Sequence, residues 1–370
     1  MFYPDKVKKP SKASYRLNIY FGVPSGDTGN IEEKEISKRL IGSLTTLPCH
    51  TREFTTDDPY PFDAIKGTPS LIHAFHAAKA GMPCHKLAEK ARLPLVVTCT
   101  GLDAYIDMYN SVLRPQLQEV LEFARKVIVP YPQMGKFIKS RLMINTEIEV
   151  IAPGIAPFNS EFDFPREHFG FSKGERLIIL EGGLLPAKNV IFAIHYLEKL
   201  IPDYPELRLV IFNTPFDTDY QKQVVAEIPG RPWIRLIDRP EDGLLPFLYR
   251  QAEVFINVSH AEGYNPFLLS AMQTGRPVLA ADVYGNHAFI KNEETFQGLG
   301  NGWLYFTSPG PGSFARIHDG EDFTNKLRFL LDNPGQASEV GQRAARIVAQ
   351  SYTAEKELYL HLQVYKALLR

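Results

Sequence analysis

Short apolar runs alternate with longer amphipathic stretches along most of the chain. The apolar runs are rich in Val, Ile, Leu and Phe and are bounded by Gly, Pro, Asn or Asp, which is typical of strands buried in a parallel sheet. Between them, apolar residues recur at the spacing of a helix that covers a sheet. Strands are expected at 15–23, 70–75, 94–98, 126–129, 147–151, 176–180, 207–212, 233–237, 254–258, 278–281 and 303–306. This alternation predicts an α/β fold built on doubly wound parallel sheets.

The length of the chain predicts more than one domain. With 370 residues it exceeds the size of one typical domain, so two are expected. A connector rich in Pro, Phe and Asn follows residue 155, and it divides an N-terminal domain over 1–155 from a C-terminal domain over 156–350. The segment 351–370 is expected to be a final helix, and residues 48–67, which are rich in Pro, Asp and Thr, are expected to be irregular.

The amino-acid composition and the net charge argue against several classes of function. Apolar residues make up 44%, charged residues 22%, and the formal net charge is −1, which is typical of a globular protein and argues against nucleic-acid binding. No apolar run reaches the ~20 residues of a membrane-spanning helix, and the polar leader 1–14 does not resemble a signal peptide. Cys49, Cys84 and Cys99 form neither a disulfide framework nor a zinc pattern, so a cytoplasmic location and no metal site are expected.

A group of basic residues is interpreted as a solvated face, with peripheral membrane contact as the less favoured alternative. Its members are Arg125, Lys126, Lys136, Lys139 and Arg141. The sequence leaves the oligomeric state open.

Residues 254–281 contain the strongest local signal for a ligand site. A buried strand is followed by a polar loop that carries Glu262, and Asn265 and Pro266 suit the N-cap and first position of the next helix. The N-terminus of a helix presents free N–H groups and a partial positive charge, which favour a phosphate. This stretch therefore predicts a site for a phosphate-bearing ligand beside Glu262.

Four features together resemble the retaining GT-B glycosyltransferases of family 4. The residues from Glu262 to Tyr264 and the helix after them look like the donor motif of that family. The segment GGLLPAKN at 182–189 looks like its diphosphate loop, and IAPGI at 151–155 looks like the strand end before its interdomain linker. The last helix is similar to the one that crosses back onto the N-terminal domain.

A narrower resemblance is to a subgroup that includes the selenosugar synthases and the glycosyltransferase 1 domain-containing proteins. It is carried by the segments 28–30, 73–77, 100–105 and 284–286, which read TGN, HAFHA, TGLDAY and YGN.

The resemblance implies a GT-B fold, in which two Rossmann-like domains face a cleft. It implies a hexosyltransferase that uses a nucleotide-diphosphate sugar, with a UDP-sugar favoured, retains anomeric configuration, and needs no metal or other cofactor. The acceptor is not identified. The implied catalytic residues are Glu262, His76 and Asp103, and the implied ligand-binding residues are Gly29, Asn30, Gly183, Lys188, Gly263, Tyr264, Asn265 and Ser270.

Several of these positions have a structural interpretation as well. Asp103 also suits a helix N-cap, Lys188 also suits a solvated loop charge, and the glycines near Asn30 also suit a turn that needs them only for geometry. His73, inside an apolar strand, is interpreted as a core histidine.

The chain departs from the family pattern at two donor positions. Ser270 stands where the family has a second Glu on the nucleotide ribose, and Gly183 and Leu185 stand where it has an Arg on the phosphates. These departures motivate an alternative, a catalytically weakened or inactive GT-B protein that acts as a binding or partner module. A sugar epimerase of GT-B shape is a third alternative.

Overall fold

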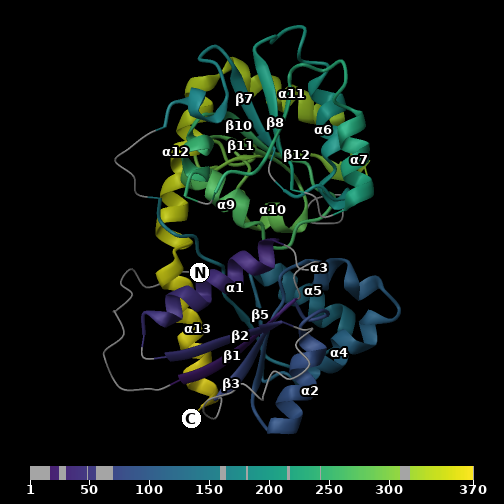
Figure 1. Cartoon of the computed structure of the whole chain (residues 1–370), viewed down its shortest axis with the longest axis vertical. Coiled ribbons are helices and arrows are strands. Elements are labelled where there is room, and N and C mark those ends of the chain that lie inside the picture. Colours follow the sequence, from purple (N-terminus) through teal and green to yellow (C-terminus); the bar gives the residue numbers. More distant parts are fainter. Residues whose placement is uncertain are drawn as a thin grey trace. The chain divides into compact units, whose positions relative to one another are not determined.

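The computed structural model describes residues 17–24, 31–47, 49–55, 70–158, 164–180, 182–214, 217–241, 243–308 and 317–369. The chain divides into two compact units, one made of Met1–Ala156 with Ser351–Arg370 and the other of Pro157–Gln350. Each unit is built on a six-stranded parallel sheet with helices packed against it (Figure 1). The predicted α/β architecture of doubly wound parallel sheets is confirmed.

The first unit orders its strands β2-β1-β3-β4-β5-β6. The strands are β1 (Leu17–Val23), β2 (Cys49–Thr55), β3 (Leu71–Phe75), β4 (Leu95–Thr98), β5 (Lys126–Val129) and β6 (Ile148–Val150). The helices are α1 (Ile31–Thr45), α2 (Gly81–Ala91), α3 (Leu102–Tyr105), the 3₁₀ turn η1 (Asp107–Tyr109), α4 (Leu113–Phe123) and α5 (Pro132–Leu142). The chain runs from β1 to one side and then returns to add β3 on the other, so the direction of strand order reverses between β1 and β3.

Strand β2 corrects the expectation that residues 48–67 are irregular. Its sequence, CHTREFT, has no apolar alternation, and only Phe54 is buried. β2 lies at the edge of the sheet, where it pairs with β1 alone. An edge strand with little buried surface is held by backbone pairing, which the apolar pattern does not reveal.

The last helix, α13 (Ala354–Leu368), is part of the first unit. The Glu357 carboxylate accepts from Arg39 Nε at 2.9 Å and Arg39 Nη2 at 3.0 Å, and from the Gly154 N–H at 3.1 Å. Gly154 is needed there, because a Cβ would lie 2.3 Å from the carbonyl of Thr353. Apolar burial of Leu362 and Tyr365 completes the attachment.

The second unit orders its strands β12-β11-β10-β7-β8-β9. The strands are β7 (Arg176–Leu180), β8 (Leu207–Phe212), β9 (Ile234–Ile237), β10 (Ala252–Asn257), β11 (Val278–Ala281) and β12 (Trp303–Tyr305), with an antiparallel pair β13 (Thr307–Ser308) and β14 (Ile317–His318). Between them lie the 3₁₀ turns η2 (Arg166–Phe169) and η3 (Pro186–Lys188) and the helices α6 (Val190–Leu197), α7 (Thr218–Ala226), α8 (Leu245–Arg250), α9 (Pro266–Gln273), α10 (Tyr284–Phe289), α11 (Gly320–Asp332) and α12 (Pro334–Ser351).

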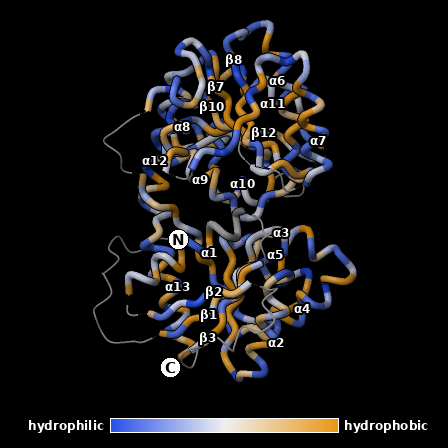
Figure 2. Tube along the Cα trace, in the orientation of Figure 1, coloured by the Kyte–Doolittle hydropathy of each residue, from blue (hydrophilic) through white to orange (hydrophobic). Residues whose placement is uncertain are grey.

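Buried residues of the strands and of the helices that cover them form the apolar core of this unit, and Figure 2 shows hydrophobic residues along its strands. The chain leaves β7 toward β8 and β9, then returns to place β10 on the other side of β7. β7 and β10 are therefore the neighbours at which the strand order reverses, and open α/β sheets bind ligands outside the carboxyl ends of such strands. Within the described residues, no helix is long and apolar enough to cross a membrane.

Candidate functional site

A buried ion pair joins the segments that follow β7 and β10. Lys188 ends η3, after β7, and Glu262 lies in the loop between β10 and α9. The Lys188 Nζ atom lies 2.9 Å from Glu262 Oε1 and 3.0 Å from Glu262 Oε2. Lys188 is 6% exposed and Glu262 2%. The structure therefore brings together two of the predicted site residues at the point where the strand order reverses.

Neutral donors complete the surroundings of the Glu262 carboxylate. Its Oε1 atom also accepts from Asn257 Nδ2 at 2.9 Å and from Ser259 Oγ at 2.6 Å. Asn286 Nδ2 in turn donates to Asn257 Oδ1 at 2.8 Å, which orients that amide. Among the described residues Oε2 accepts only from Lys188, so it keeps acceptor capacity for a ligand hydroxyl.

Two glycines allow the backbone to approach this pair closely. The Gly285 N–H donates to the Glu262 carbonyl at 3.0 Å, and a Cβ on Gly285 would lie 2.3 Å from the Gly263 carbonyl oxygen. Gly182 has φ +138, and a Cβ there would lie 3.1 Å from Lys188 Cδ. The first turn of α10 thus holds Glu262 by its backbone, and Gly182 leaves room for the Lys188 stem.

Helix α9 begins as its sequence predicts. The Asn265 side chain accepts from the Leu268 N–H at 3.1 Å, and Pro266 is the first helical residue. Asn265 is buried and its Oδ1 is engaged in the cap. Ser270 lies one turn further along α9 and is partly buried.

Tyr264 and Gly183 are both buried beside the pair. The Tyr264 ring packs edge-on against Phe289 of α10, with ring centroids 6.2 Å apart, and a contact with the ligand stays a prediction. The Gly183 carbonyl accepts from the Leu185 N–H at 3.0 Å, which closes the turn after β7.

In the first unit, Asp103 is enclosed by backbone donors. Its carboxylate accepts from the N–H groups of Ala77 at 2.8 Å, Thr100 at 3.1 Å, Gly101 at 2.8 Å and Ala104 at 2.9 Å. Asp103 is 1% exposed. These bonds fix the loops after β3 and β4 to each other. The N-cap interpretation is wrong, because Asp103 is the second residue of α3 and two of its donors, Thr100 and Gly101, precede that helix. A role in acceptor binding stays a prediction.

His76 follows β3 in a left-handed conformation with φ 76 and is fully buried. Its Nδ1 accepts from the Lys79 N–H at 3.1 Å, and its Nε2 lies 3.6 Å from Asp107 Oδ2. Burial lowers the pKa of His76 to about 4, whereas burial and the nearby Asp103 raise the pKa of Asp107 to about 6. The Asp107 side chain is 18% exposed, so Asp107 is the part of this couple that solvent reaches.

Two other predictions for the first unit have different outcomes. His73 is a core histidine as expected, because its Nδ1 lies 2.7 Å from Tyr365 Oη and its Nε2 lies 2.7 Å from Thr98 Oγ1. Burial holds the pKa of His73 well below its usual value. Gly29 and Asn30 lie outside the described residues.

Sequence reasoning missed Asn257, Ser259 and Asp107 as parts of these clusters. Asn257 gives a signal, since it is a polar residue at the carboxyl end of an otherwise apolar strand. Asp107 gives no such signal in the sequence, because it comes close to His76 only when the loops have folded. Among the described residues, no group of three or more His, Cys, Asp and Glu side chains is placed to hold a metal ion.

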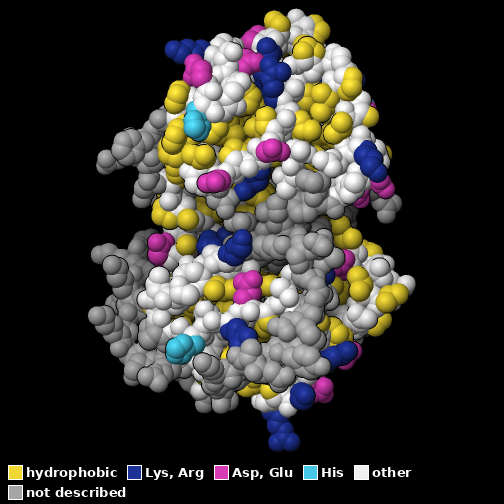
Figure 3. Space-filling view, viewed as in Figure 1, with side chains coloured by type: hydrophobic (Ala, Val, Ile, Leu, Met, Phe, Trp, Pro, Cys, Tyr) yellow, Lys and Arg dark blue, Asp and Glu magenta, His cyan; other side chains and the backbone are white. Residues whose placement is uncertain are grey.

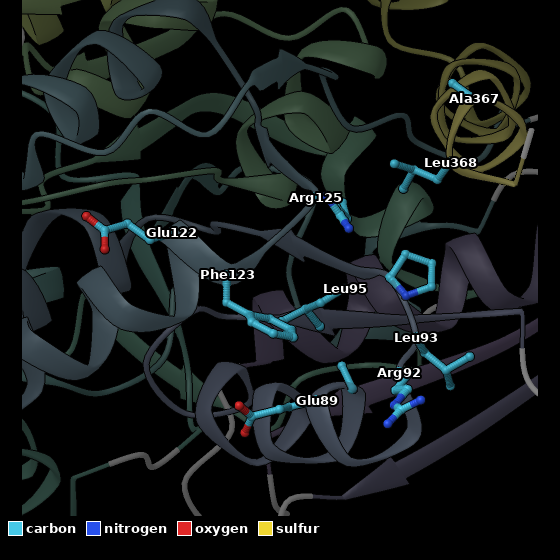
Figure 4. Close-up of a pocket in the computed structure, with 11 residues that line it drawn as sticks. Glu89, Arg92, Leu93, Leu95, Glu122, Phe123, Arg125, Ala367 and Leu368 are labelled. Carbon is cyan, nitrogen blue, oxygen red and sulfur yellow. The ribbon is translucent and has the colours of Figure 1, made fainter.

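A groove in the first unit lies away from His76 and Asp103 of the same unit. It has a volume of about 790 Å³ and is lined by Ala88, Glu89, Arg92, Leu93, Pro94, Leu95, Glu122, Phe123, Arg125, Ala367 and Leu368. Phe123 lies beside Leu95 in it, while Glu122 points away (Figure 4). Leu95 begins β4 and Arg125 precedes β5, so the groove lies at the amino ends of the strands, opposite the edge that carries His76 and Asp103.

Comparison with known proteins shows the family. The family model for glycosyl transferases group 1 matches residues 161–347, which is about half of the chain. The chain belongs to this family. The match covers the whole Lys188–Glu262 site, so that site lies in the part of the chain that the family shares.

One relative of this chain carries the name of the predicted subgroup. Glycosyltransferase 1 domain-containing protein 1 of Xenopus tropicalis is 25% identical over 287 residues, which are 74% of this chain and 78% of that protein. The predicted resemblance to this subgroup is consistent with that relative.

Two solved structures share the fold. Sucrose-phosphate synthase from Thermosynechococcus elongatus superposes with a TM-score of 0.74 at 16% identity, over 95% of this chain and 99% of that chain. Anabaena Alr3699/HepE in complex with UDP-glucose superposes with a TM-score of 0.74 at 16% identity, over 95% of this chain and 100% of that chain. The fold is GT-B, as predicted.

Proposed function

We propose that this protein is a retaining hexosyltransferase that moves a sugar from a nucleotide-diphosphate sugar, with UDP as the favoured nucleotide, to the hydroxyl of an acceptor. The observation that carries the proposal is the Lys188–Glu262 pair at the carboxyl ends of β7 and β10. A place where the strand order reverses is the usual ligand site of an open α/β sheet. The relative solved with UDP-glucose supports a uridine nucleotide.

In this proposal the second unit binds the donor. The Lys188 ammonium supplies positive charge and N–H donors at this site, so a phosphate oxygen that enters the site can become one of its hydrogen-bond acceptors. The first turn of α9 adds backbone N–H groups and a partial positive charge. The Glu262 Oε2 atom accepts from a sugar hydroxyl and so orients the sugar.

The reaction follows from these contacts. The bond between the anomeric carbon and the phosphate oxygen breaks, and its electron pair stays on the phosphate, where Lys188 stabilises the charge. The acceptor oxygen bonds the anomeric carbon on the face that the phosphate leaves, and its proton passes to the departing phosphate. Charge on the leaving group is then stabilised by protein groups, without a metal ion.

The test is a pair of matched variants. Glu262→Gln keeps the shape of the side chain and removes the charge, and Glu253→Gln removes the charge of the Glu253–Arg176 pair (2.9 Å), which joins the same strands near their amino ends. We expect Glu262→Gln to lower donor turnover, measured as UDP released from UDP-sugars, by roughly 100-fold or more. Glu253→Gln should leave turnover within about twofold. Equal turnover in the wild type and Glu262→Gln would remove Glu262 from the mechanism.

Ser270 and the absence of an Arg in 182–189 favour a second candidate, a GT-B protein that binds a sugar nucleotide without turnover. Calorimetry and product analysis separate the two. Binding of UDP with no release of UDP from any UDP-sugar, in the presence of a broad set of acceptors, is the result expected for the binding module. Absence of nucleoside-diphosphate binding at millimolar concentration contradicts both.

A further inference from the structure

The connection between α3 and α4 exposes three large apolar side chains. Ile106 is 42% exposed, Tyr109 59% and Val112 68%. Met143, the residue that follows α5, is 81% exposed. Figure 3 shows hydrophobic side chains at the edge of the first unit over this connection, which lies between the labels α3 and α4 of Figure 1. Single exposed apolar residues are ordinary on a protein surface, whereas several in one place indicate an interaction site.

Hydrogen bonds at both ends hold this connection beside α5. At its start, the Tyr131 hydroxyl donates to the Tyr105 hydroxyl at 2.9 Å, and the Tyr105 ring packs on Phe137 of α5 with centroids 5.1 Å apart. At its end, Arg114 Nη2 donates to the Arg141 carbonyl in the last turn of α5 at 2.9 Å. The connection therefore lies beside α5 from the start of that helix to its last turn, and the exposed side chains of both segments belong to one region of the surface.

This region carries positive charge. Lys136, Lys139 and Met143 are exposed and recur at the spacing of one helix face. The segments 105–116 and 132–146 together contain four basic residues and one acidic residue, Asp107. The basic residues are Arg114, Lys136, Lys139 and Arg141. Within the described part of the chain, none of these four side chains forms an ion pair.

Two carboxylates beside this region are directed toward histidines of the first unit. Asp107 Oδ2 lies 3.6 Å from His76 Nε2, and Glu119 Oε1 of α4 lies 3.6 Å from His85 Nδ1 of α2. The region therefore combines exposed apolar side chains with basic side chains whose charge is not neutralised by a neighbouring carboxylate.

The structure also divides the basic residues that the sequence groups together. Lys126 Nζ lies 2.6 Å from Glu147 Oε2 and 3.2 Å from Glu149 Oε1, so its charge is neutralised. Arg125 lines the groove at the amino ends of the strands. The three remaining members of the group are those on α5, beside the apolar connection.

The chemistry of this surface fits an anionic lipid bilayer better than a protein. Lys is depleted at protein–protein interfaces, whereas basic side chains beside exposed apolar ones are typical of surfaces that bind membranes. Each Lys or Arg close to an anionic leaflet strengthens binding. Apolar side chains that stand out from the protein enter the boundary between the lipid headgroups and the acyl chains.

We propose that the first unit docks on anionic phospholipid membranes through this surface. The apolar side chains of the connection and of Met143 enter the headgroup region, and the basic side chains bond lipid phosphates. The proposal goes beyond the proposed transferase activity and does not depend on it. The residues of the docking surface are Ile106, Tyr109, Val112, Arg114, Lys136, Lys139, Arg141 and Met143.

The test is cosedimentation of the full chain with vesicles. Vesicles made of equal parts of phosphatidylcholine and phosphatidylglycerol are compared with vesicles of phosphatidylcholine alone. We expect the chain to bind the mixed vesicles tighter by roughly tenfold or more, and we expect added salt to weaken this binding because it screens the basic side chains. A wild type that binds both kinds of vesicle equally, or neither, overturns the proposal.

Two double variants assign the binding to this surface. Val112→Asp with Met143→Asp replaces apolar side chains by charged ones, and it should weaken binding to the mixed vesicles by roughly tenfold or more. Asp is compatible with the left-handed backbone of Met143, whose φ is 52, so the variant should fold as the wild type does, which thermal unfolding measures. Lys136→Glu with Lys139→Glu should weaken binding by a similar factor and reduce its dependence on salt.

The matched controls lie in the second unit. Leu299→Asp changes an exposed apolar residue, and Lys222→Glu changes an exposed lysine of α7. Both should bind the mixed vesicles as the wild type does. The proposal is wrong if the surface variants bind as tightly as the controls. It is also wrong if light scattering shows that the wild type is a dimer and that Val112→Asp with Met143→Asp is a monomer, because the surface is then an interface between two copies of the chain.

Discussion

The two units each bury a carboxylate at the carboxyl edge of a parallel sheet, but they satisfy it differently. Among the residues that the structure describes, the Glu262 carboxylate in the second unit accepts hydrogen bonds from side chains, one of which is the ammonium of Lys188. Asp103 in the first unit is bonded by the backbone N–H groups of two loops. Their exposure is nearly the same, 2% and 1%.

The difference separates two uses of a buried charge. Backbone donors are fixed by the fold, so the Asp103 carboxylate is committed to holding the loops after β3 and β4 together. Side-chain donors can rotate, so the Lys188 ammonium can change its hydrogen-bond partners when a ligand binds. Burial and a place at the sheet edge do not distinguish the two carboxylates, whereas the type of donor does.

The largest expected effect is that of Lys188→Met. It leaves the Glu262 carboxylate buried without a counter-ion, which should lower the free energy of unfolding of the second unit by about 3–5 kcal/mol. It also removes the cation for the phosphates, so we expect UDP affinity to fall by roughly 100-fold or more. Urea unfolding and calorimetry measure the two effects.

The double variant Lys188→Met with Glu262→Gln separates stability from binding. It removes both charges, so most of the lost stability should return while UDP binding stays weak. Recovery of UDP binding together with stability would show that Lys188 is a structural ion-pair partner only. Arg176→Met, which breaks the pair with Glu253 near the other edge of the same strands, is the control and should leave UDP affinity unchanged.

Asp103→Ala tests the other half of the comparison. The backbone N–H groups that Asp103 satisfies would be left buried without an acceptor, at a cost of about 1–3 kcal/mol for each one that water does not reach. We expect unfolding of the first unit at lower urea concentration, and unchanged UDP affinity below that concentration. A loss of UDP affinity in the folded variant would contradict the purely structural role.

The smallest expected effect is the pH dependence of Asp107→Asn. Because the pKa of Asp107 in the folded chain is raised to about 6, its ionised form destabilises the wild type above that pH, and the penalty disappears as pH falls and the folded carboxyl takes up a proton. At pH 8 the free energy of unfolding of the variant should therefore exceed that of the wild type by on the order of 1 kcal/mol, and thermal unfolding should show a higher midpoint. The difference should shrink between pH 6 and pH 4.

His76 gives this experiment a second feature. The pKa of His76 in the folded chain is lowered to about 4. Between pH 6.5 and pH 4 the unfolded chain therefore takes up a proton at His76 while the folded chain does not, so the free energy of unfolding decreases as the pH is lowered through this window. In the wild type, protonation of Asp107 opposes this decrease. In Asp107→Asn the contribution of His76 is no longer opposed. If lowering the pH from 6.5 to 4 destabilises Asp107→Asn no more than it destabilises the wild type, the opposing contributions of His76 and Asp107 are contradicted.

The sequence by itself determined the strands, the helices and the local chemistry of each loop. Apolar runs such as that of β10 predict buried strands because burial requires apolar side chains on both faces, and Asn265 and Pro266 mark the start of α9 because capping is a local interaction. Strand β2 was not predicted, because an edge strand is held by backbone pairing, which leaves no apolar pattern in the sequence.

Only the tertiary structure decided which groups meet. Lys188 and Glu262 are 74 residues apart. The sequence places each residue after a strand or in a loop, but not beside a particular partner, because strand order sets which loops adjoin. The donors that surround a carboxylate, and therefore whether it holds loops together or is available to a ligand, depend on those long-range contacts.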